Sequence, residues 1–163
     1  MRVGKVNCLW HNARMPETRP RPCSVAAALG LIGEKWSLLV IRELAFGVHR
    51  FDAIARNTGA PRDILTNRLR RLEAAGVLEK RQYQERPPRS EYHLTRAGQE
   101  LRPVLLSLAQ WGDRWAVDAP TTAFVHTCGA ELELVHTCRA CGGEVTGRDL
   151  RAVSLAAGWG SAA

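Results

Sequence analysis

The sequence lacks the features that mark membrane-bound, secreted and catalytic proteins. None of its 163 residues falls in a run of roughly 18 or more apolar residues, so no membrane span is predicted. The N-terminus lacks the charged-then-apolar order of a secretory signal. A glycine-rich phosphate loop, a His-Glu-x-x-His pair and a persuasive acid–base pair are also missing, so we do not expect an enzyme. We expect a cytoplasmic protein with no membrane partner.

Acidic residues are in short supply. There are 16 of them against 23 Lys and Arg, which gives a formal net charge of +7. The basic excess lies in residues 1–22 and 50–96, whereas residues 97–163 carry more acids than bases. An even spread of bases would only solubilise the surface, but positive charge concentrated in one middle segment favours a polyanionic partner. Double-stranded DNA is the partner that we expect.

The chain divides into three parts by composition. Residues 1–22 carry three prolines and no sustained periodicity, so we interpret them as a flexible basic arm. Residues 23–117 hold the apolar periodicity of a packed domain. Residues 118–163 combine a linker, a Cys/His-rich stretch expected to form a β-hairpin, and a small-residue tail expected to be disordered from position 154.

Helical patterns fill most of the middle part. Ser24 is a plausible N-cap for a short first helix, and helices are then expected over 35–46, 51–57 and 61–76. Gly59 ends the third helix, and Pro61 stands in the first turn of the fourth. The fourth helix places Leu65, Leu69 and Leu72 on a single stripe.

A hairpin and a last helix complete the pattern. Two strands are expected over 77–84 and 90–94, joined by a solvated tip at 85–89 with two prolines and two arginines. Thr95 then caps a long helix that reaches about Val117, with an expected kink at Pro103. The predicted fold class is mainly α with a small β-hairpin wing, which is a winged helix-turn-helix, plus a C-terminal β-hairpin that is either zinc-ribbon-like or a plain hairpin.

The fourth helix predicts a DNA-reading element. The major groove admits one α-helix, which must bury one face and offer the other to base edges. Thr58, or the backbone at the start of the helix, would hold a phosphate. An amphipathic helix with external arginines can also be a solvated surface helix, but the preceding short helix and the basic hairpin favour DNA. The expected contact residues lie on this helix and at the hairpin tip: Arg62, Asp63, Thr66, Asn67, Arg70, Arg71, Arg86 and Arg89.

Three blocks of sequence resemble a known family. They are GEKWSLLVIREL at 33–44, LTNRLRRLEAAG at 65–76 and YHLTRAG at 92–98, in that order. The pattern resembles the HxlR-type branch of the MarR-like winged helix-turn-helix transcription regulators, over roughly 23–115. The chain departs from the family at Pro61-Arg62-Asp63, which bears on the operator sequence, and at Ser24.

The resemblance implies a homodimer that reads a palindromic operator. It implies a repressor or an activator of a nearby gene, often one that responds to aldehydes, quinones, oxidants or drugs. The dimer would be built largely from the first and last helices. The last helix independently carries more large apolar residues than one core-facing stripe needs, unless it is fully buried within one chain. Its candidate dimer residues are Leu101, Val104, Leu105, Leu108, Trp111 and Trp115.

The five cysteines do not form an even set for a disulfide framework. Cys23 stands at the start of the first helix, where the helix dipole lowers a thiol pKa. The resemblance implies an oxidation switch there, because some family members use a cysteine at this position. The alternative is a small buried apolar residue.

The C-terminal Cys/His stretch has metal-ligand spacing. Cys138-x-x-Cys141-Gly is typical of a metal-binding turn, and His126-x-Cys128 could present two further ligands. The four would form a closed Cys₃His structural zinc site, with His136 as an alternative ligand. A reversible disulfide and plain hairpin packing are the other interpretations.

Two rival functions follow from the same residues. A thiol oxidoreductase using Cys138 and Cys141 would need a βαβ setting, which the pattern does not offer. A winged helix with a zinc hairpin could instead bind a protein partner without reading DNA. A pocket between the last helix and the core could hold a small hydrophobic effector.

Overall fold

The computed structural model describes residues 23–153 and 155. The predicted arm at 1–22 and all but one residue of the predicted tail lie outside the described residues. The elements follow in the order α1 Ser24–Ile32, α2 Ser37–Ala45, α3 Phe51–Thr58, α4 Arg62–Ala74, β1 Leu78–Gln84, β2 Arg89–Leu94, α5 Arg96–Gln99 and α6 Arg102–Trp115.

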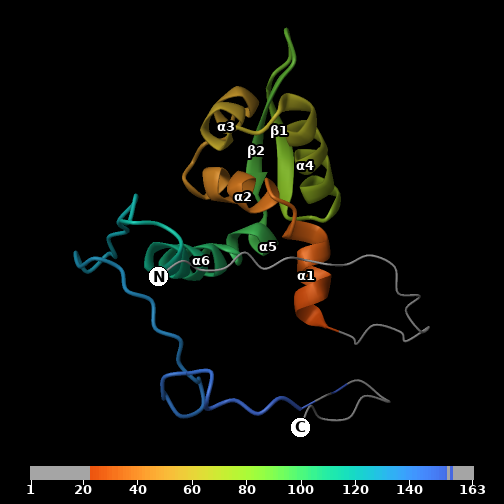
Figure 1. Cartoon of the computed structure of the whole chain (residues 1–163). Coiled ribbons are helices and arrows are strands. Elements are labelled where there is room, and N and C mark those ends of the chain that lie inside the picture. Colours follow the sequence, from red (N-terminus) through yellow and green to blue (C-terminus); the bar gives the residue numbers. More distant parts are fainter. Residues whose placement is uncertain (1–22, 154, 156–163) are drawn as a thin grey trace, which may run out of the picture.

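The architecture is a winged helix-turn-helix, as predicted. Helices α2, α3 and α4 gather around the two-stranded antiparallel sheet, and the β1–β2 tip projects beyond them (Figure 1). The strands pair from Leu78 with Leu94 to Gln84 with Arg89, with a bulge between Gln82 and Gln84. Both strands lie within one residue of their predicted bounds.

The core is formed by apolar side chains from α1, α2, α3, α4 and β1. The leucine stripe of α4 is fully buried, as its spacing predicted. Every buried hydrophobic residue in the described part of the chain lies between positions 32 and 78: Ile32, Val40, Ile41, Leu44, Ile54, Ala60, Leu65, Leu69, Leu72, Val77 and Leu78.

Two helix starts differ from the prediction. Cys23, not Ser24, is the N-cap of α1, because the carbonyl of Cys23 already accepts a hydrogen bond from the Ala27 amide at 3.0 Å. Pro61 is the N-cap of α4 and therefore precedes the first turn. No single helix in the described ranges is long and apolar enough to cross a membrane, and α1 and α2, which pass that test only as a pair, are bent by 78°.

The predicted last helix is two helices. Thr95 caps α5 as predicted, accepting a hydrogen bond from the Gly98 amide at 3.3 Å. The chain then turns at Glu100 and Leu101, and α6 starts with Pro103 in its first turn. Pro103 has no N–H to bond the preceding turn, so a continuous helix would lose that hydrogen bond and the helix restarts instead.

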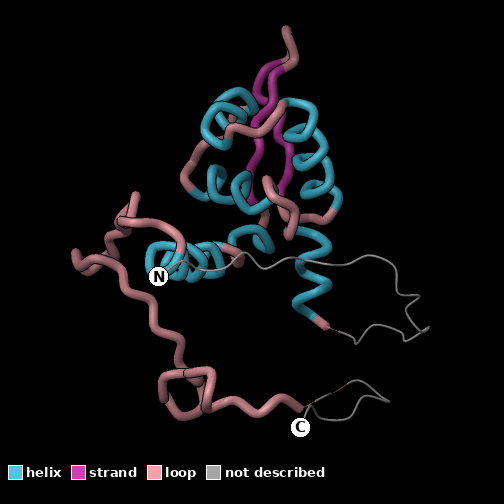
Figure 2. Tube along the Cα trace, viewed as in Figure 1, coloured by secondary structure: helices cyan, strands magenta, loops and turns pink. Residues whose placement is uncertain are grey.

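The single β-hairpin predicted for the Cys/His-rich stretch, residues 124–145, is not what the structure has. The structure has two small loops, each closed by one isolated bridge, Val125 with Glu131 and Thr137 with Glu144. The described chain after α6, residues 116–153, is drawn as loop (Figure 2). Alternating residues form a sheet only when one face is buried, and this stretch has no fully buried side chain.

Candidate nucleic-acid interface

A tight turn orients α4 against α3. Gly59 ends α3 in the left-handed conformation with φ of 68°, which glycine adopts without steric cost. Thr58 is buried, and its hydroxyl donates to the Ile54 carbonyl at 2.7 Å and accepts from the Ala60 amide at 3.3 Å. Thr58 therefore stabilises the turn. Its hydroxyl is not free to hold a phosphate, which corrects the prediction for this side chain.

Helix α4 presents a polar face opposite its leucines. Arg62, Asp63, Asn67, Arg70 and Arg71 are exposed, as predicted. Thr66 is half-buried, and its hydroxyl donates to the Arg62 carbonyl at 2.8 Å. The exposed side chains supply the donors and acceptors that base edges require.

The arginines of α4 differ in how they are held. Arg62 pairs with Asp52 of α3 at 2.7 Å and lies over the Phe51 ring at 4.8 Å. Arg71 forms an ion pair with Glu34, between α1 and α2. Asp63, Asn67 and Arg70 are exposed and form no side-chain hydrogen bond or ion pair with any described residue, so these α4 side chains are available to a ligand.

Glu34 also pairs with Arg68, which is mostly buried. We call Glu34, Arg68 and Arg71 the Glu34 clasp, since one carboxylate joins the α1–α2 turn to two positions of α4. This contact leaves no local signal in the sequence, because Glu34 stands 34 and 37 positions from its two partners along the chain. Arg71 was predicted to contact DNA, whereas the clasp directs its side chain toward Glu34 in the turn after α1.

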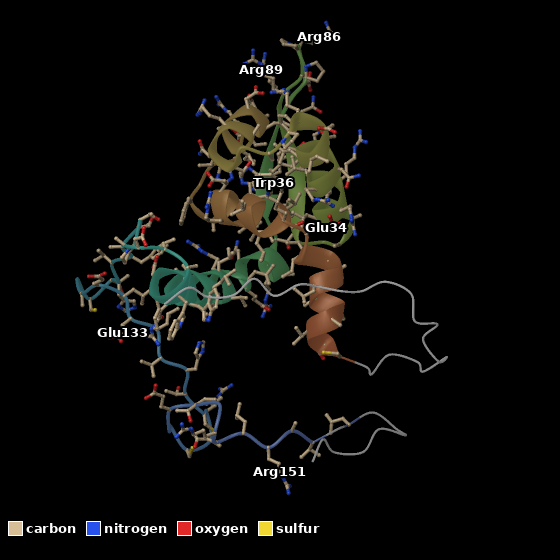
Figure 3. All side chains as sticks on the ribbon, viewed as in Figure 1. Glu34, Trp36, Arg86, Arg89, Glu133 and Arg151 are labelled. Atoms are coloured by element: carbon tan, nitrogen blue, oxygen red, sulfur yellow. The ribbon has the colours of Figure 1, made fainter. Side chains whose placement is uncertain are left out.

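The wing carries basic residues at its tip. Arg86 and Arg89 are exposed at the far end of the hairpin (Figure 3). Nearer the body, Arg50 pairs with Glu91 at 3.2 Å and lies over the Tyr83 ring at 5.3 Å. Arg50 is a further basic residue beside the wing that the sequence analysis did not select, because it precedes α3 and reaches β2 only through the fold.

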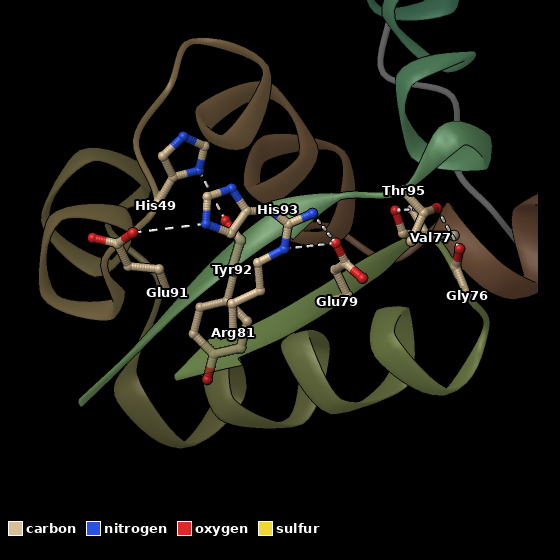
Figure 4. A network of polar contacts seen from close by, with 9 residues as sticks. All are labelled: His49, Gly76, Val77, Glu79, Arg81, Glu91, Tyr92, His93 and Thr95. Atoms are coloured by element: carbon tan, nitrogen blue, oxygen red, sulfur yellow. Dashed lines mark hydrogen bonds and ion pairs between the residues drawn. The ribbon is translucent and has the colours of Figure 1, made fainter. Parts of the chain in front are cut away.

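The base of the wing is fixed to the body by polar contacts (Figure 4). His49 Nδ1 lies 2.9 Å from the Tyr92 carbonyl oxygen, and the His49 carbonyl accepts from the Tyr92 amide at 2.9 Å. The His49 and His93 rings stack with centroids 4.2 Å apart. Burial raises the pKa of Tyr92, and the nearby Glu73 carboxylate adds to that rise. These contacts fix the β2 side of the hairpin to the segment between α2 and α3.

The candidate interface lies within a region that matches a known protein family. The model of the HxlR-like helix-turn-helix family matches residues 31–119, which include α2 to α6 and the whole candidate interface. The chain belongs to the HxlR-like helix-turn-helix family. Rv3095, an HTH-type transcriptional regulator of Mycobacterium tuberculosis, is 42% identical over 130 residues, which cover 78% of this chain and 82% of the relative.

Solved structures agree with this membership. The crystal structure of PA1607, a candidate transcription factor, superposes with a TM-score of 0.73 at 30% identity and covers 81% of this chain and 94% of that one. The redox regulator HypR in its oxidised form gives a TM-score of 0.52 at 33% identity, covering 56% of this chain and 96% of HypR. The predicted resemblance to HxlR-type, MarR-like winged-helix regulators is confirmed.

The predicted dimer residues of this HxlR-like chain divide into two groups. Leu101 and Leu105 are half-buried and pack against the core of their own chain. The other four project outward as a stripe along α6, at 49–70% exposure: Val104, Leu108, Trp111 and Trp115. Helix α1 exposes a second apolar face with Val25 and Leu29 one turn apart, and Leu31 is exposed on the other side of the same helix.

The cysteines of the HxlR-like chain are all thiols in the described residues. Cys23 is exposed at the start of α1, so its burial in the chain's own core is excluded. Cys138 and Cys141 lie in one loop, where backbone N–H groups of Cys141 and Ala140 and the Cys141 thiol lower the pKa of Cys138. His126 and Cys128 lie in the other loop. The structure thus brings the four predicted metal ligands together as two pairs, and no described group of three or more potential ligands surrounds one point.

Two hollows lie beside α6. A cavity of about 530 Å³ separates α6 from residues 120–134, and Gln110, Asp113 and Phe124 are among its lining residues. A second cavity, of about 370 Å³, lies between α2, α6 and the linker. The ring centroids of Phe46 and Phe124, two of its lining residues, are 6.1 Å apart. The second hollow, which lies against α2, matches the position of the predicted effector pocket between the last helix and the core, whereas the first lies between α6 and the segment that follows it. An effector remains a prediction.

Proposed function

We propose that the chain is a sequence-specific, double-stranded-DNA-binding transcription regulator that acts as a repressor. One observation carries the proposal: α4 buries its leucines completely while Asn67 and Arg70 stand free on its opposite face. That arrangement meets the two requirements of a helix in the major groove. Membership in the HxlR-like family supports it.

The residues would divide into base-reading and backbone-positioning groups. Asn67 can bond adenine and Arg70 can bond guanine, each through two hydrogen bonds to the base edge. Arg62 and Asp63 lie closest to the start of α4, and Arg62 would exchange Asp52 for DNA on binding. Arg86 and Arg89 at the wing tip would contact phosphates or the minor groove beside the site.

The regulator would act as a homodimer on a palindromic operator. The α6 stripe is apolar and exposed, as is the face of α1. Contiguous exposed apolar surface of this kind marks an interaction site, and a second copy offers a matching surface. Two copies related by two-fold symmetry would present two α4 helices to two half-sites.

A titration on DNA tests the proposal. The full chain is titrated onto the DNA upstream of its own gene and onto a scrambled duplex, at about 150 mM salt. We expect a preference of about a thousandfold or more, a footprint with two-fold symmetry, and a rise in reporter expression when the gene is deleted. A binding preference without any change in reporter expression would contradict the repressor role. Equally weak binding to every duplex taken from the DNA around the gene would contradict sequence-specific recognition.

The rival function is a protein-binding winged helix. Phosphate contacts make affinity fall steeply with salt, because binding releases condensed counterions, whereas an apolar protein interface does not show that dependence. Absence of DNA binding even at low salt would move this rival to the front.

A further inference from the structure

The two loops after α6 share one design. The first knuckle (residues 124–132) is closed by the Leu132 amide on the Phe124 carbonyl at 2.7 Å, and the second knuckle (residues 136–145) by the Val145 amide on the His136 carbonyl at 2.7 Å. In each knuckle a cysteine is followed by a glycine with positive φ, 88° at Gly129 and 71° at Gly142. Side chains rarely adopt that conformation, so both turns are built in the same way around a Cys-Gly pair.

Each knuckle also holds a pair of metal-ligating atoms. In the first, His126 Nδ1 lies 3.3 Å from Cys128 Sγ. Two ligands of a tetrahedral zinc ion, with bonds near 2.0–2.3 Å, stand about 3.6 Å apart. The first pair therefore already has close to the separation that one ion requires.

The second pair is arranged around the sulfur of Cys138. That sulfur accepts backbone N–H bonds from Ala140 and Cys141 and is hydrogen-bonded by the Cys141 thiol. The two sulfurs consequently face one region of space.

The segment that carries the knuckles has no core to stabilise it. No residue between 118 and 153 is fully buried, and Val125, Val135 and Val153 are exposed. Stretches of this size that cannot bury apolar surface are commonly stabilised by a metal or a disulfide. The two sulfurs of the second knuckle could form a disulfide, but this would leave His126 and Cys128 without a role.

We propose that the two knuckles close on one zinc ion, bound by His126, Cys128, Cys138 and Cys141. Ten residue steps separate Cys128 from Cys138, and a chain of that length reaches roughly 33 Å, so the knuckles can meet. His126 is preferred to His136 as the histidine ligand, because His126 Nδ1 already lies 3.3 Å from Cys128 Sγ, whereas His136 contacts the Ser107 hydroxyl of α6. Binding releases one proton from each of the three thiols, and the neutral imidazole of His126 completes the shell.

The site is structural, since four protein ligands leave zinc no open position for a substrate. It would order the segment beside α6, next to the larger cavity. The inference rests on the two knuckles alone. It stands or fails independently of DNA binding.

Metal analysis of the full chain tests the inference. The protein is produced in zinc-supplemented medium and desalted, and its metal content is measured by mass spectrometry. We expect one zinc per chain, and a loss of at least tenfold in zinc occupancy in both Cys128→Ser and Cys141→Ser. The control Cys23→Ser alters a cysteine far from the knuckles and keeps its zinc. Full zinc content in Cys128→Ser would overturn the shared site, as would a zinc-free chain with a Cys138–Cys141 disulfide.

Thiol counting gives a second readout that does not depend on variants. Five cysteines are present. In the native zinc-loaded protein, the thiols of Cys128, Cys138 and Cys141 should react with a thiol reagent only after a chelator is added. Prompt reaction of all five, with zinc present in the sample, would contradict the proposal. Circular dichroism of each variant checks that the helices remain folded.

Discussion

The winged-helix body (residues 24–115) and the C-terminal segment (residues 118–153) use opposite means to hold a shape. The body places all the fully buried apolar side chains of the described chain in one cluster formed by helices α1 to α4 and strand β1. The segment buries none completely and is shaped by backbone hydrogen bonds around two glycines. The contrast teaches that apolar content alone does not make a core: valines and leucines occur in both regions, but only the body has the helical spacing that lines them up.

The largest expected effect comes from cutting into the core of the body. Leu69→Ala removes a side chain that is 1% exposed and should lower the free energy of unfolding by about 2–5 kcal/mol, because it removes buried contacts and leaves a cavity. Denaturant titration followed by circular dichroism measures this. The matched change Val135→Ala in the segment, where the side chain is 56% exposed, should change the unfolding energy by less than about 0.5 kcal/mol. Equal effects would break the comparison.

Trp111 belongs to the body, but its side chain is exposed in the single chain, like the side chains of the C-terminal segment. If two copies cover it, Trp111→Ala should weaken the dimer by about 2 kcal/mol or more, or roughly thirtyfold in Kd, since buried tryptophans dominate interfaces. Analytical ultracentrifugation across a dilution series measures the effect. Leu150→Ala, which removes an exposed leucine of the segment, serves as the control and should leave the dimer unchanged. A dimer of unaltered strength in Trp111→Ala would place the interface elsewhere.

Asn67→Ala asks whether the surface of the body reads sequence. We expect a loss of about 1–3 kcal/mol on the operator and relaxed preference at one base position. Arg89→Ala should weaken all sequences similarly, because it removes a phosphate contact. Arg151→Ala, an equal loss of charge in the segment, should barely alter either (Figure 3). Competition binding against a panel of single-base operator variants measures all three, and uniform losses for Asn67→Ala would contradict its role.

Removing metal should affect one region only. If zinc holds the knuckles, a chelator should open the segment to proteolysis between residues 118 and 153. The unfolding energy of the body should meanwhile change by less than about 0.5 kcal/mol, since no contact of its core is altered. Limited proteolysis with mass spectrometry, run beside thermal unfolding, measures both. Loss of both regions together would show that the segment is part of the body's cooperative unit.

The smallest effect concerns Tyr92 at the base of the wing. Burial, aided by Glu73, raises its pKa above the ordinary value of 10.0. The folded chain therefore keeps the phenol proton at a pH where the unfolded chain has released it. This contribution to stability is complete below pH 10 and is lost as the pH rises through the folded pKa. Tyr92→Phe should flatten the alkaline fall in unfolding energy, and an unchanged fall would assign it to other groups.

The sequence predicted the body well, for a physical reason. Leu65, Leu69 and Leu72 recur at helical spacing, and local periodicity survives folding whenever one face is buried. The same reasoning overextended the last helix, because it counted apolar residues across Pro103 without requiring the helix to restart. Alternation over 124–145 failed as a strand signal, since no partner surface covers that stretch.

The candidate site was predicted in part. Exposed Asn67 and Arg70 follow from the spacing of α4, whereas the tethering of Arg62 by Asp52 and of Arg71 by Glu34 depends on contacts between distant positions. Such pairs leave no local pattern. The sequence predicted the four ligand residues of the two knuckles from their spacing. It did not predict that the two pairs lie apart in space, because spacing along the chain does not determine how a segment without a core is arranged.

The Glu34 clasp has a consequence for operator architecture. It links the turn that follows α1 to two positions about one turn apart on α4, so in a dimer paired through α1 the two α4 helices would keep a set distance and phase. Duplex DNA repeats every 10–10.5 base pairs, or about 34–36 Å, so one inserted base pair rotates a half-site by about 34°. The clasp would therefore make the affinity for an operator depend on the number of base pairs between its half-sites as much as on the bases within them.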